Sequence, residues 1–222
     1  MTRSGLLLTN ILIMIALAVA PPPAFPTSCN IIPTADMLDP GSVRLEFEND
    51  GYPRIGGADS ISYVFTQVGV SPWLELGIDR YDLSGEAENS LNLKVRIADE
   101  RDSTPAVALG AMDIMEGCAS TCYGVATRSF GRFRLHAGYI HADYSKGLML
   151  GCDHELLRDT YLLADRMPGS ENYLTLGLYR EFGNRWAVTL TCGLANGDET
   201  NLTAINLSYT FPLFAADDHV TR

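Results

Sequence analysis

Hydrophobic and polar residues alternate with a period of two along most of the chain after residue 41. Near the C-terminus, Leu174, Leu176 and Leu178 alternate with small or polar residues, and segments 186–194 and 204–211 follow the same rule. This period indicates strands whose two faces meet different environments. The segments are long enough for a tilted strand to cross a bilayer. We therefore predict an all-β fold, a transmembrane antiparallel up-and-down β-barrel.

The alternation predicts about twelve strands, and at least about 10. They cover residues 42–49, 60–70, 73–82, 90–98, 106–116, 121–130, 133–143, 147–155, 160–166, 173–180, 186–194 and 204–211. The short turns at 71–72 and 131–132 follow even-numbered strands, and the longer connection at 50–59 follows an odd-numbered one. Bacterial barrels alternate in this way between periplasmic turns and external loops. The link at 99–105 breaks the pattern.

Composition favours a membrane barrel over other protein classes. The net charge of -11 excludes a nucleic-acid partner, because neutralising phosphates needs a basic face. Hydrophobic residues make up 46% of the chain, yet beyond residue 20 no apolar run is long enough for a spanning helix. A barrel reconciles the two observations, since half of its strand residues face lipid.

The N-terminus predicts export. Arg3 precedes a mostly apolar stretch, 6–20, and three prolines at 21–23 end any helix, as in a signal peptide. A retained membrane anchor is the alternative. The predicted divisions are a signal peptide at 1–20, a Pro-rich irregular segment at 21–41, the barrel domain at 42–214 and a polar tail at 215–222. This arrangement predicts location in the outer membrane of a diderm bacterium.

The alternate strand positions that carry charged side chains should face the lumen. A lipid-facing Arg or Lys near the bilayer midplane would cost about 2 to 4 kcal/mol. The predicted lumen-facing polar residues are Arg44, Glu46, Glu48, Glu75, Asp79, Lys94, Arg96, Arg128, Arg134, His136 and Asp153. Their signs are mixed, so the lumen is either filled by its own ion pairs or forms a selective conduit.

Catalytic chemistry has one candidate pattern. His141 and Ser145, near a predicted external rim, are the residue types of a hydrolase acting on outer-leaflet lipids. No third group can be placed, so we predict a non-enzymatic protein and keep this hydrolase as an alternative. A secreted soluble β-sandwich is the other alternative. The sequence has no phosphate-binding loop and no metal-ligand cluster, which predicts no cofactor and no metal.

The cysteines are unusual for a barrel. Cys118 and Cys122 flank the link between the fifth and sixth predicted strands, where an oxidising periplasm could join them in a disulfide. A pair of buried free thiols is the alternative. Cys152 and Cys192 share the parity of the lipid-facing leucines and should behave as small apolar residues.

The segments NIIPTADMLDPGSVRL at 30–45 and NLSYTF at 206–211 resemble the short YjbH-like outer-membrane β-barrel proteins. Segments 91–95, 104–110 and 172–177 fit the same pattern. The resemblance implies outer-membrane lipid and the barrel assembly machinery as partners. It also implies a link to exopolysaccharide export, with polysaccharide or small solutes as ligands. The chain departs from the family by continuing past Phe211, the aromatic that the assembly machinery would read, and by its cysteines.

Overall fold

The computed structural model describes residues 28–81, 88–114, 121–142, 145–183 and 185–213. These residues form twelve strands: β1 (Ser42–Gly51), β2 (Ile61–Ser71), β3 (Leu74–Tyr81), β4 (Glu88–Ala98), β5 (Ala106–Met112), β6 (Thr121–Phe130), β7 (Phe133–His141), β8 (Lys146–Leu157), β9 (Thr160–Arg166), β10 (Tyr173–Phe182), β11 (Trp186–Ala195) and β12 (Leu202–Pro212). Within these ranges, no helix has the length and apolarity to span a membrane. The predicted signal peptide and the whole predicted tail lie outside the described residues and stay predictions.

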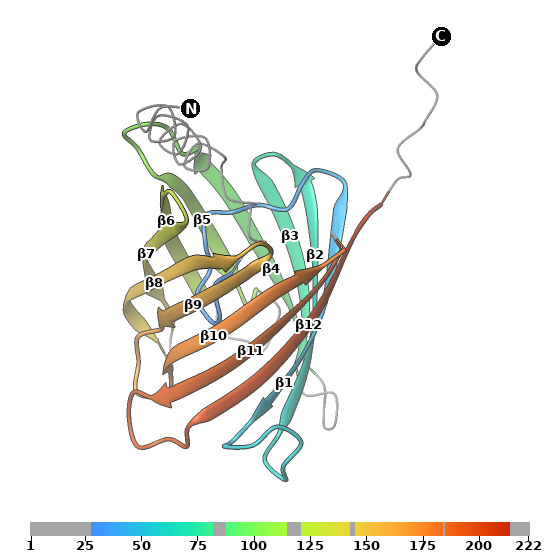
Figure 1. Ribbon diagram of the computed structural model, residues 1–222, viewed down its shortest axis with the longest axis vertical. Helices are drawn as coiled ribbons and strands as arrows, with labels where there is room; N and C mark the ends of the chain where they lie inside the picture. The colour runs from blue at the N-terminus through green and yellow to red at the C-terminus, as the bar shows by residue number, and fades with distance from the viewer. Residues whose placement is uncertain (1–27, 82–87, 115–120, 143–144, 184, 214–222) are drawn as a thin grey trace, which may run out of the picture.

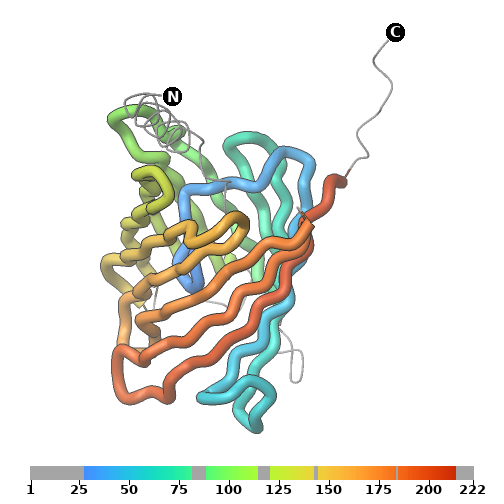
Figure 2. Tube along the Cα trace, in the orientation of Figure 1, coloured from blue at the N-terminus to red at the C-terminus, as the bar shows by residue number. Residues whose placement is uncertain are grey.

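All twelve strands form one closed antiparallel barrel, whose strands tilt strongly around a common axis (Figures 1 and 2). Each strand pairs with its neighbours in sequence, and β1 closes the barrel against β12 from Ser42 opposite Pro212 to Gly51 opposite Thr203. Closure lets every strand bond on both edges, as backbone in hydrocarbon requires. The predicted barrel is confirmed. The β-sandwich alternative is wrong, because a sandwich needs two separate sheets.

The predicted strands overlap all twelve observed ones, and the clearest differences are at strand ends. The fifth strand stops at Met112, short of the predicted residue 116. Asp113 has a φ of 56°, a left-handed conformation that a strand cannot contain. The seventh strand stops at His141, short of the predicted residue 143, and beyond it Ala142 N–H donates to the Ser145 carbonyl at 2.8 Å.

The outer surface of the barrel is apolar. On β10, Leu174, Leu176 and Leu178 are exposed, whereas Thr175 and Tyr179 are buried inside. Exposed large hydrophobic residues of the same kind recur on the other strands, including Leu45, Phe47, Leu76, Ile78, Leu91, Ile97, Leu109, Leu135, Leu148, Leu150, Leu162, Leu190 and Leu207. A continuous apolar surface of this extent is unstable in water and fits the hydrocarbon layer of a bilayer.

The two ends of the barrel differ in their connections. At the end where β1 begins and β12 finishes, uppermost in Figure 1, the turns at 72–73, 131–132 and 158–159 are short, and 99–105 is the exception. The opposite end carries the longer connections 52–60 and 196–201. The expected alternation of short and long connections therefore holds for most of the barrel.

Aromatic side chains surround the end with the short turns. Trp73, Phe130, Phe133, Phe182 and Trp186 are all exposed and lie within a residue or two of a turn at that end. Amphipathic and aromatic rings collect at the boundary between hydrocarbon and headgroups. This end therefore carries one aromatic girdle of a membrane barrel.

Replacing Leu176 with arginine tests the assignment of the outer face. Leu176 lies near the middle of β10 and is 55% exposed on the outside. In lipid the Leu176→Arg variant should lose about 2 to 4 kcal/mol of unfolding free energy, and Leu194→Arg, near a strand end, about 0 to 1 kcal/mol. Urea unfolding of both variants in vesicles measures the difference. Equal losses at the two depths would contradict a bilayer around the belt.

Candidate functional site: the plugged lumen

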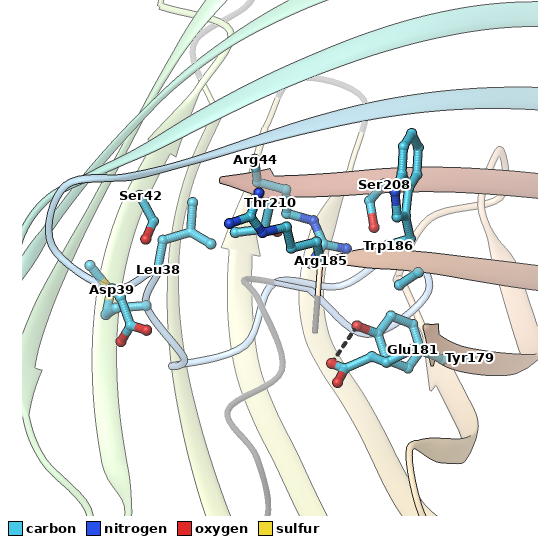
Figure 3. Close-up of a pocket in the computed structure, with 12 residues that line it drawn as sticks. Leu38, Asp39, Ser42, Arg44, Tyr179, Glu181, Arg185, Trp186, Ser208 and Thr210 are labelled. Atoms are coloured by element: carbon cyan, nitrogen blue, oxygen red, sulfur yellow. Dashed lines mark hydrogen bonds between the residues drawn. The ribbon is translucent and has the colours of Figure 1, made fainter. Parts of the chain in front are cut away.

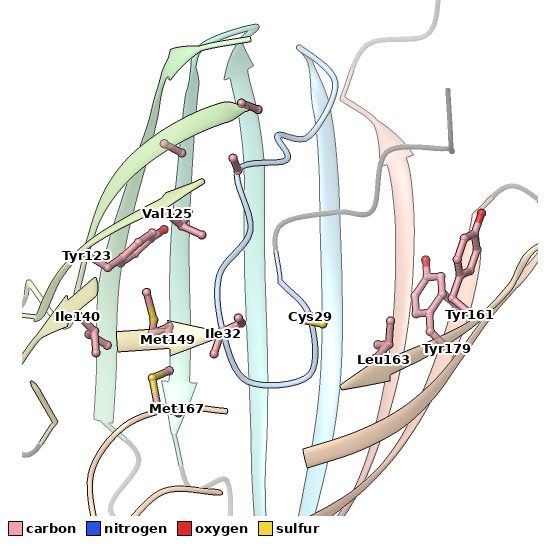
Figure 4. Packing of buried hydrophobic residues seen from close by; sticks show 14 residues of the cluster. Cys29, Ile32, Tyr123, Val125, Ile140, Met149, Tyr161, Leu163, Met167 and Tyr179 are labelled. Atoms are coloured by element: carbon pink, nitrogen blue, oxygen red, sulfur yellow. The ribbon is translucent and has the colours of Figure 1, made fainter. Parts of the chain in front are cut away.

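The N-terminal segment before β1 folds into the barrel. We call residues 28–41 the plug segment. It makes a U-turn inside the lumen, where Cys29 N–H donates to the Ile32 carbonyl at 2.9 Å, and then rises to the start of β1 (Figure 4). Ile32 and Ala35 are fully buried among side chains from the barrel wall, including Met149 and Leu163. The described segment is irregular, and its insertion into the lumen was not predicted.

The tip of the U-turn is held by one carboxylate. Asp165, on β9, accepts hydrogen bonds through Oδ2 from the backbone N–H groups of Asn30, Ile31 and Ile32, at 2.7, 2.9 and 3.3 Å. Its other oxygen, Oδ1, accepts from the hydroxyl of Thr175. Hydrogen bonds from three successive amides to a charged oxygen are strong when they are buried. Asp165 therefore anchors the tip.

An ion-pair network holds the rising arm of the plug segment. Arg134 donates through Nη1 to both carboxylate oxygens of Asp36, at 3.2 and 3.0 Å, and through Nε to both oxygens of Asp153, at 3.1 and 3.0 Å. His136 Nε2 lies 2.8 Å from Asp153 Oδ2, and His136 Nδ1 lies 2.9 Å from the hydroxyl of Thr127. Thr127 in turn accepts from Ala35 N–H at 2.9 Å. The network joins the plug segment to β6, β7 and β8.

The opposite wall supplies further contacts. Glu75, on β3, accepts from Leu38 N–H at 2.9 Å and pairs with Lys94 at 3.3 Å. Arg96 donates through Nη2 to the Ala35 carbonyl at 3.0 Å. The irregular backbone of the plug segment thus finds partners on both sides of the barrel, as buried backbone must.

Two strand glycines leave space for the plug segment. A Cβ on Gly177 would overlap the side-chain oxygen of Asn30, and a Cβ on Gly69 would overlap the carbonyls of Leu38 and Asp39. Glycine allows this close approach because it has no side chain. Gly177 therefore leaves room for Asn30, and Gly69 leaves room for the backbone of Leu38 and Asp39.

Two of the cavities among the described residues lie beside the plug segment. The larger, about 510 Å³, lies between its tip and the inner wall of β1 to β4. The smaller, about 180 Å³, lies among Met37, Leu38 and the ends of β10 to β12 (Figure 3). Arg44 and Tyr179 line both cavities and therefore stand between them. Arg44 is paired with Glu46 at 2.5 Å, and the Tyr179 hydroxyl donates to Glu181 at 2.8 Å.

Ten of the eleven polar residues predicted for the lumen have their side chains on the inner face or in contact with the plug segment. They are Arg44, Glu46, Glu48, Glu75, Asp79, Lys94, Arg96, Arg134, His136 and Asp153. Arg128 differs. Arg128 lies opposite Leu135 in the register of β6 and β7, and Leu135 faces outward. The Arg128 guanidinium donates to the Arg101 and Thr104 carbonyls of the 99–105 connection. The inward parity of β6 belongs to Thr121, Tyr123, Val125 and Thr127.

Sequence reasoning missed several residues that matter inside the barrel. Asp36 and Asp165 are buried carboxylates, and each has a partner more than 90 residues away in the chain. Tyr179 carries no charge and was assigned no role. The sequence signal that could have found Asp165 is its place among apolar residues at the inward parity of β9, since a buried carboxylate needs a donor.

The hydrolase candidate is not supported by the geometry. Ser145 is buried, and its hydroxyl donates to the Pro168 carbonyl at 2.6 Å, while His141 is exposed at the end of β7. A nucleophile must instead lie free within reach of its base. Thr127, His136 and Asp153 form a chain of the nucleophile–base–acid type, but it lies beneath the plug segment and Thr127 is bonded to Ala35. That chain is structural.

The candidate disulfide stays a prediction. Cys118 lies outside the described residues, and Cys122 is exposed on β6. Cys192 is also exposed, on the outer parity, while Cys152 is half-buried. Cys29 sits at the buried tip of the plug segment, with its sulfur 3.7 Å from the Cys152 carbonyl.

Comparison with known proteins identifies the fold. No protein-family model matches the chain, and no curated protein matches it in sequence. Among solved structures, it resembles the KdgM porin, with a TM-score of 0.54 at 10% identity over 76% of this chain and 99% of the porin. It also resembles the KdgM porin in complex with disordered oligogalacturonate, with a TM-score of 0.56 at 11% identity over 77% of this chain and 99% of that one. The chain shares the barrel fold of this porin.

A third solved structure is similar over more of the chain but with lower agreement. It is outer membrane phospholipase A from Escherichia coli, with a TM-score of 0.48 at 12% identity over 90% of this chain and 98% of the enzyme. The similarity to YjbH-like proteins stays a prediction beside these findings.

Proposed function

We propose that this protein is a non-enzymatic, porin-like barrel of the outer membrane whose lumen is closed by the plug segment at rest. The observation that carries the proposal is that two cavities lie beside the plug segment and share Arg44 and Tyr179 in their linings. We expect movement of these two side chains to join the cavities while the plug segment stays in place.

Three features support an outer-membrane location. The apolar belt suits a bilayer, the aromatic girdle marks an interface, and the fold is shared with the KdgM porin. The short-turn end is then periplasmic, and the larger cavity extends toward the external end. The partners proposed with this location are outer-membrane lipid and, during assembly, the barrel assembly machinery.

The proposal also concerns the class of solute that the barrel would pass. The resemblance to YjbH-like proteins suggests polysaccharide, and a connection with exopolysaccharide export. The oligogalacturonate of the KdgM complex is not carried over, because Glu48, Asp50 and Asp79 line the larger cavity and would repel a polyanion. Small neutral or cationic solutes fit these charges better.

Conductance of the Tyr179→Ala variant tests the proposal. Removing the ring that stands between the two cavities should join them and raise single-channel conductance in planar bilayers above that of the native chain. The matched control is Tyr161→Ala, which removes a buried ring 6.0 Å from Tyr179 that lines neither cavity. Gel mobility with and without boiling shows that each variant is a closed barrel. Equal conductance in folded native, Tyr179→Ala and Tyr161→Ala barrels would overturn the proposed route.

A further inference from the structure

The wall of the larger cavity has more carboxyl groups than cationic groups. Its two cations are already paired, Arg44 with Glu46 at 2.5 Å and Lys94 with Glu75 at 3.3 Å. The remaining carboxylates in the wall are Glu48, Asp50 and Asp79, and the ion pairs among the described residues include none of them. Glu48 and Glu46 accept from the same amide nitrogen, that of Asn206, at 3.1 and 2.9 Å, so these carboxylates are close neighbours.

The cavity also has hydrogen-bond acceptors without donors. Oδ1 of Asp50, Oδ1 of Asp79 and Oδ1 of Asn92 are buried, and within the described part of the chain none of the three has a hydrogen-bond partner. Asp79 is only 7% exposed, and its other oxygen accepts from Asn92 Nδ2 at 2.5 Å. Because a buried acceptor without a donor is costly, the site favours a ligand that brings donors.

Aromatic rings complete the wall. Tyr63 stacks on Phe65, with ring centroids 5.9 Å apart, and meets Tyr81 edge-on at 5.8 Å. All three line the larger cavity beside the unpaired carboxylates. Aromatic faces next to carboxylates attract organic cations, through the ring quadrupole and through charge.

We infer that the larger cavity is a binding site for a small organic cation carrying ammonium groups. Ammonium groups offer donors and no acceptor, which suits a wall whose charged and amide side chains present acceptors. A bare metal ion fits less well, since no three His, Cys, Asp or Glu side chains in the described ranges come together as a metal site would require. The inference names the solute class of the proposed porin-like function, but binding itself does not require passage through the barrel.

The test measures binding to the detergent-solubilised full chain by calorimetry. The probes are putrescine, butanediol and succinate, which share a four-carbon length and differ in charge, together with glucose and magnesium chloride. Putrescine should bind, and the other four should bind at least about tenfold more weakly, the difference expected for one lost charge-assisted interaction. Added salt should weaken putrescine binding.

Variants assign the binding to this cavity. The double variant Glu48→Gln and Asp79→Asn keeps the shape of the wall and should weaken putrescine binding about tenfold or more. Glu155→Gln, which removes a carboxylate outside the cavity that pairs with Arg132, should leave it unchanged. Equal binding of butanediol, glucose or magnesium, or unchanged putrescine binding in the folded double variant, would overturn the inference.

The two proposals fail separately. Putrescine binding by a barrel that never conducts, even as Tyr179→Ala, would overturn only the porin-like function. Conductance by a barrel that ignores putrescine would overturn only the cation site.

Discussion

Replacing Arg134 with alanine should lower the free energy of unfolding by about 3 to 5 kcal/mol, the usual cost of breaking a buried ion pair from one side. The arginine lies between Asp36 of the plug segment and Asp153 of β8, and its side chain is 4% exposed. Without it, two buried carboxylates lose their shared cation, and the plug segment loses its main tie to β7.

The matched control is Arg132, two residues away. Its side chain is 53% exposed and its ion pair with Glu155 is 3.8 Å long, so Arg132→Ala should cost less than about 1 kcal/mol. Urea unfolding of both variants in vesicles, followed by tryptophan fluorescence, gives the two values. A small loss for Arg134→Ala would mean that the Asp36–Arg134–Asp153 network does not stabilise the barrel. Adding Asp36→Asn to Arg134→Ala should restore part of the loss.

Replacing residues 28–37 with a Gly/Ser segment of the same length should open the lumen. The variant keeps residues 1–27 and β1 but loses the Asp165, Thr127 and Arg134 contacts. A flexible segment has no reason to remain inside, because nothing there offsets its conformational entropy. We expect the largest conductance of any variant, with steps well above those of Tyr179→Ala.

The control for this replacement is the same Gly/Ser substitution in residues 54–59, an exposed part of the connection between β1 and β2. It should leave conductance at the native level. Asp165→Ala, which removes the acceptor of three plug amides, should fall between native and plug-less barrels. A plug-less barrel that is folded and heat-modifiable yet conducts like the native chain would show that the plug segment does not close the lumen.

Strand number explains why such a plug is needed. Eight-stranded barrels are filled by their own wall side chains, and sixteen-stranded barrels enclose an aqueous channel. A barrel of twelve strands lies between these two cases and has a wider interior than one of eight. Here the chain places its own N-terminal segment in that space, and four of the inward charged residues, Glu75, Arg96, Arg134 and Asp165, bond to it.

The sequence by itself predicted the barrel, from the alternation of residues together with the length of the segments and the composition. A period of two places apolar side chains on one face of each strand, and that face can be read locally because it depends only on neighbouring positions. Leu174, Leu176 and Leu178 on one side of β10 and Thr175 on the other illustrate this. The inward charges followed from the same parity. Arg128 was misplaced because the parity of β6 is weak in sequence, with small residues such as Gly124 and Ala126 on its outer side.

The lumen's contents were decided only by the tertiary structure. The plug segment has no periodicity, since its backbone bonds to side chains from strands all around the barrel rather than to a neighbouring strand. The partners Asp36 and Arg134 are 98 residues apart, and Asn30 and Asp165 are 135 apart. Such pairs form because barrel closure places strands that are distant in sequence around one small space. A local sequence pattern does not show which of their residues will be in contact.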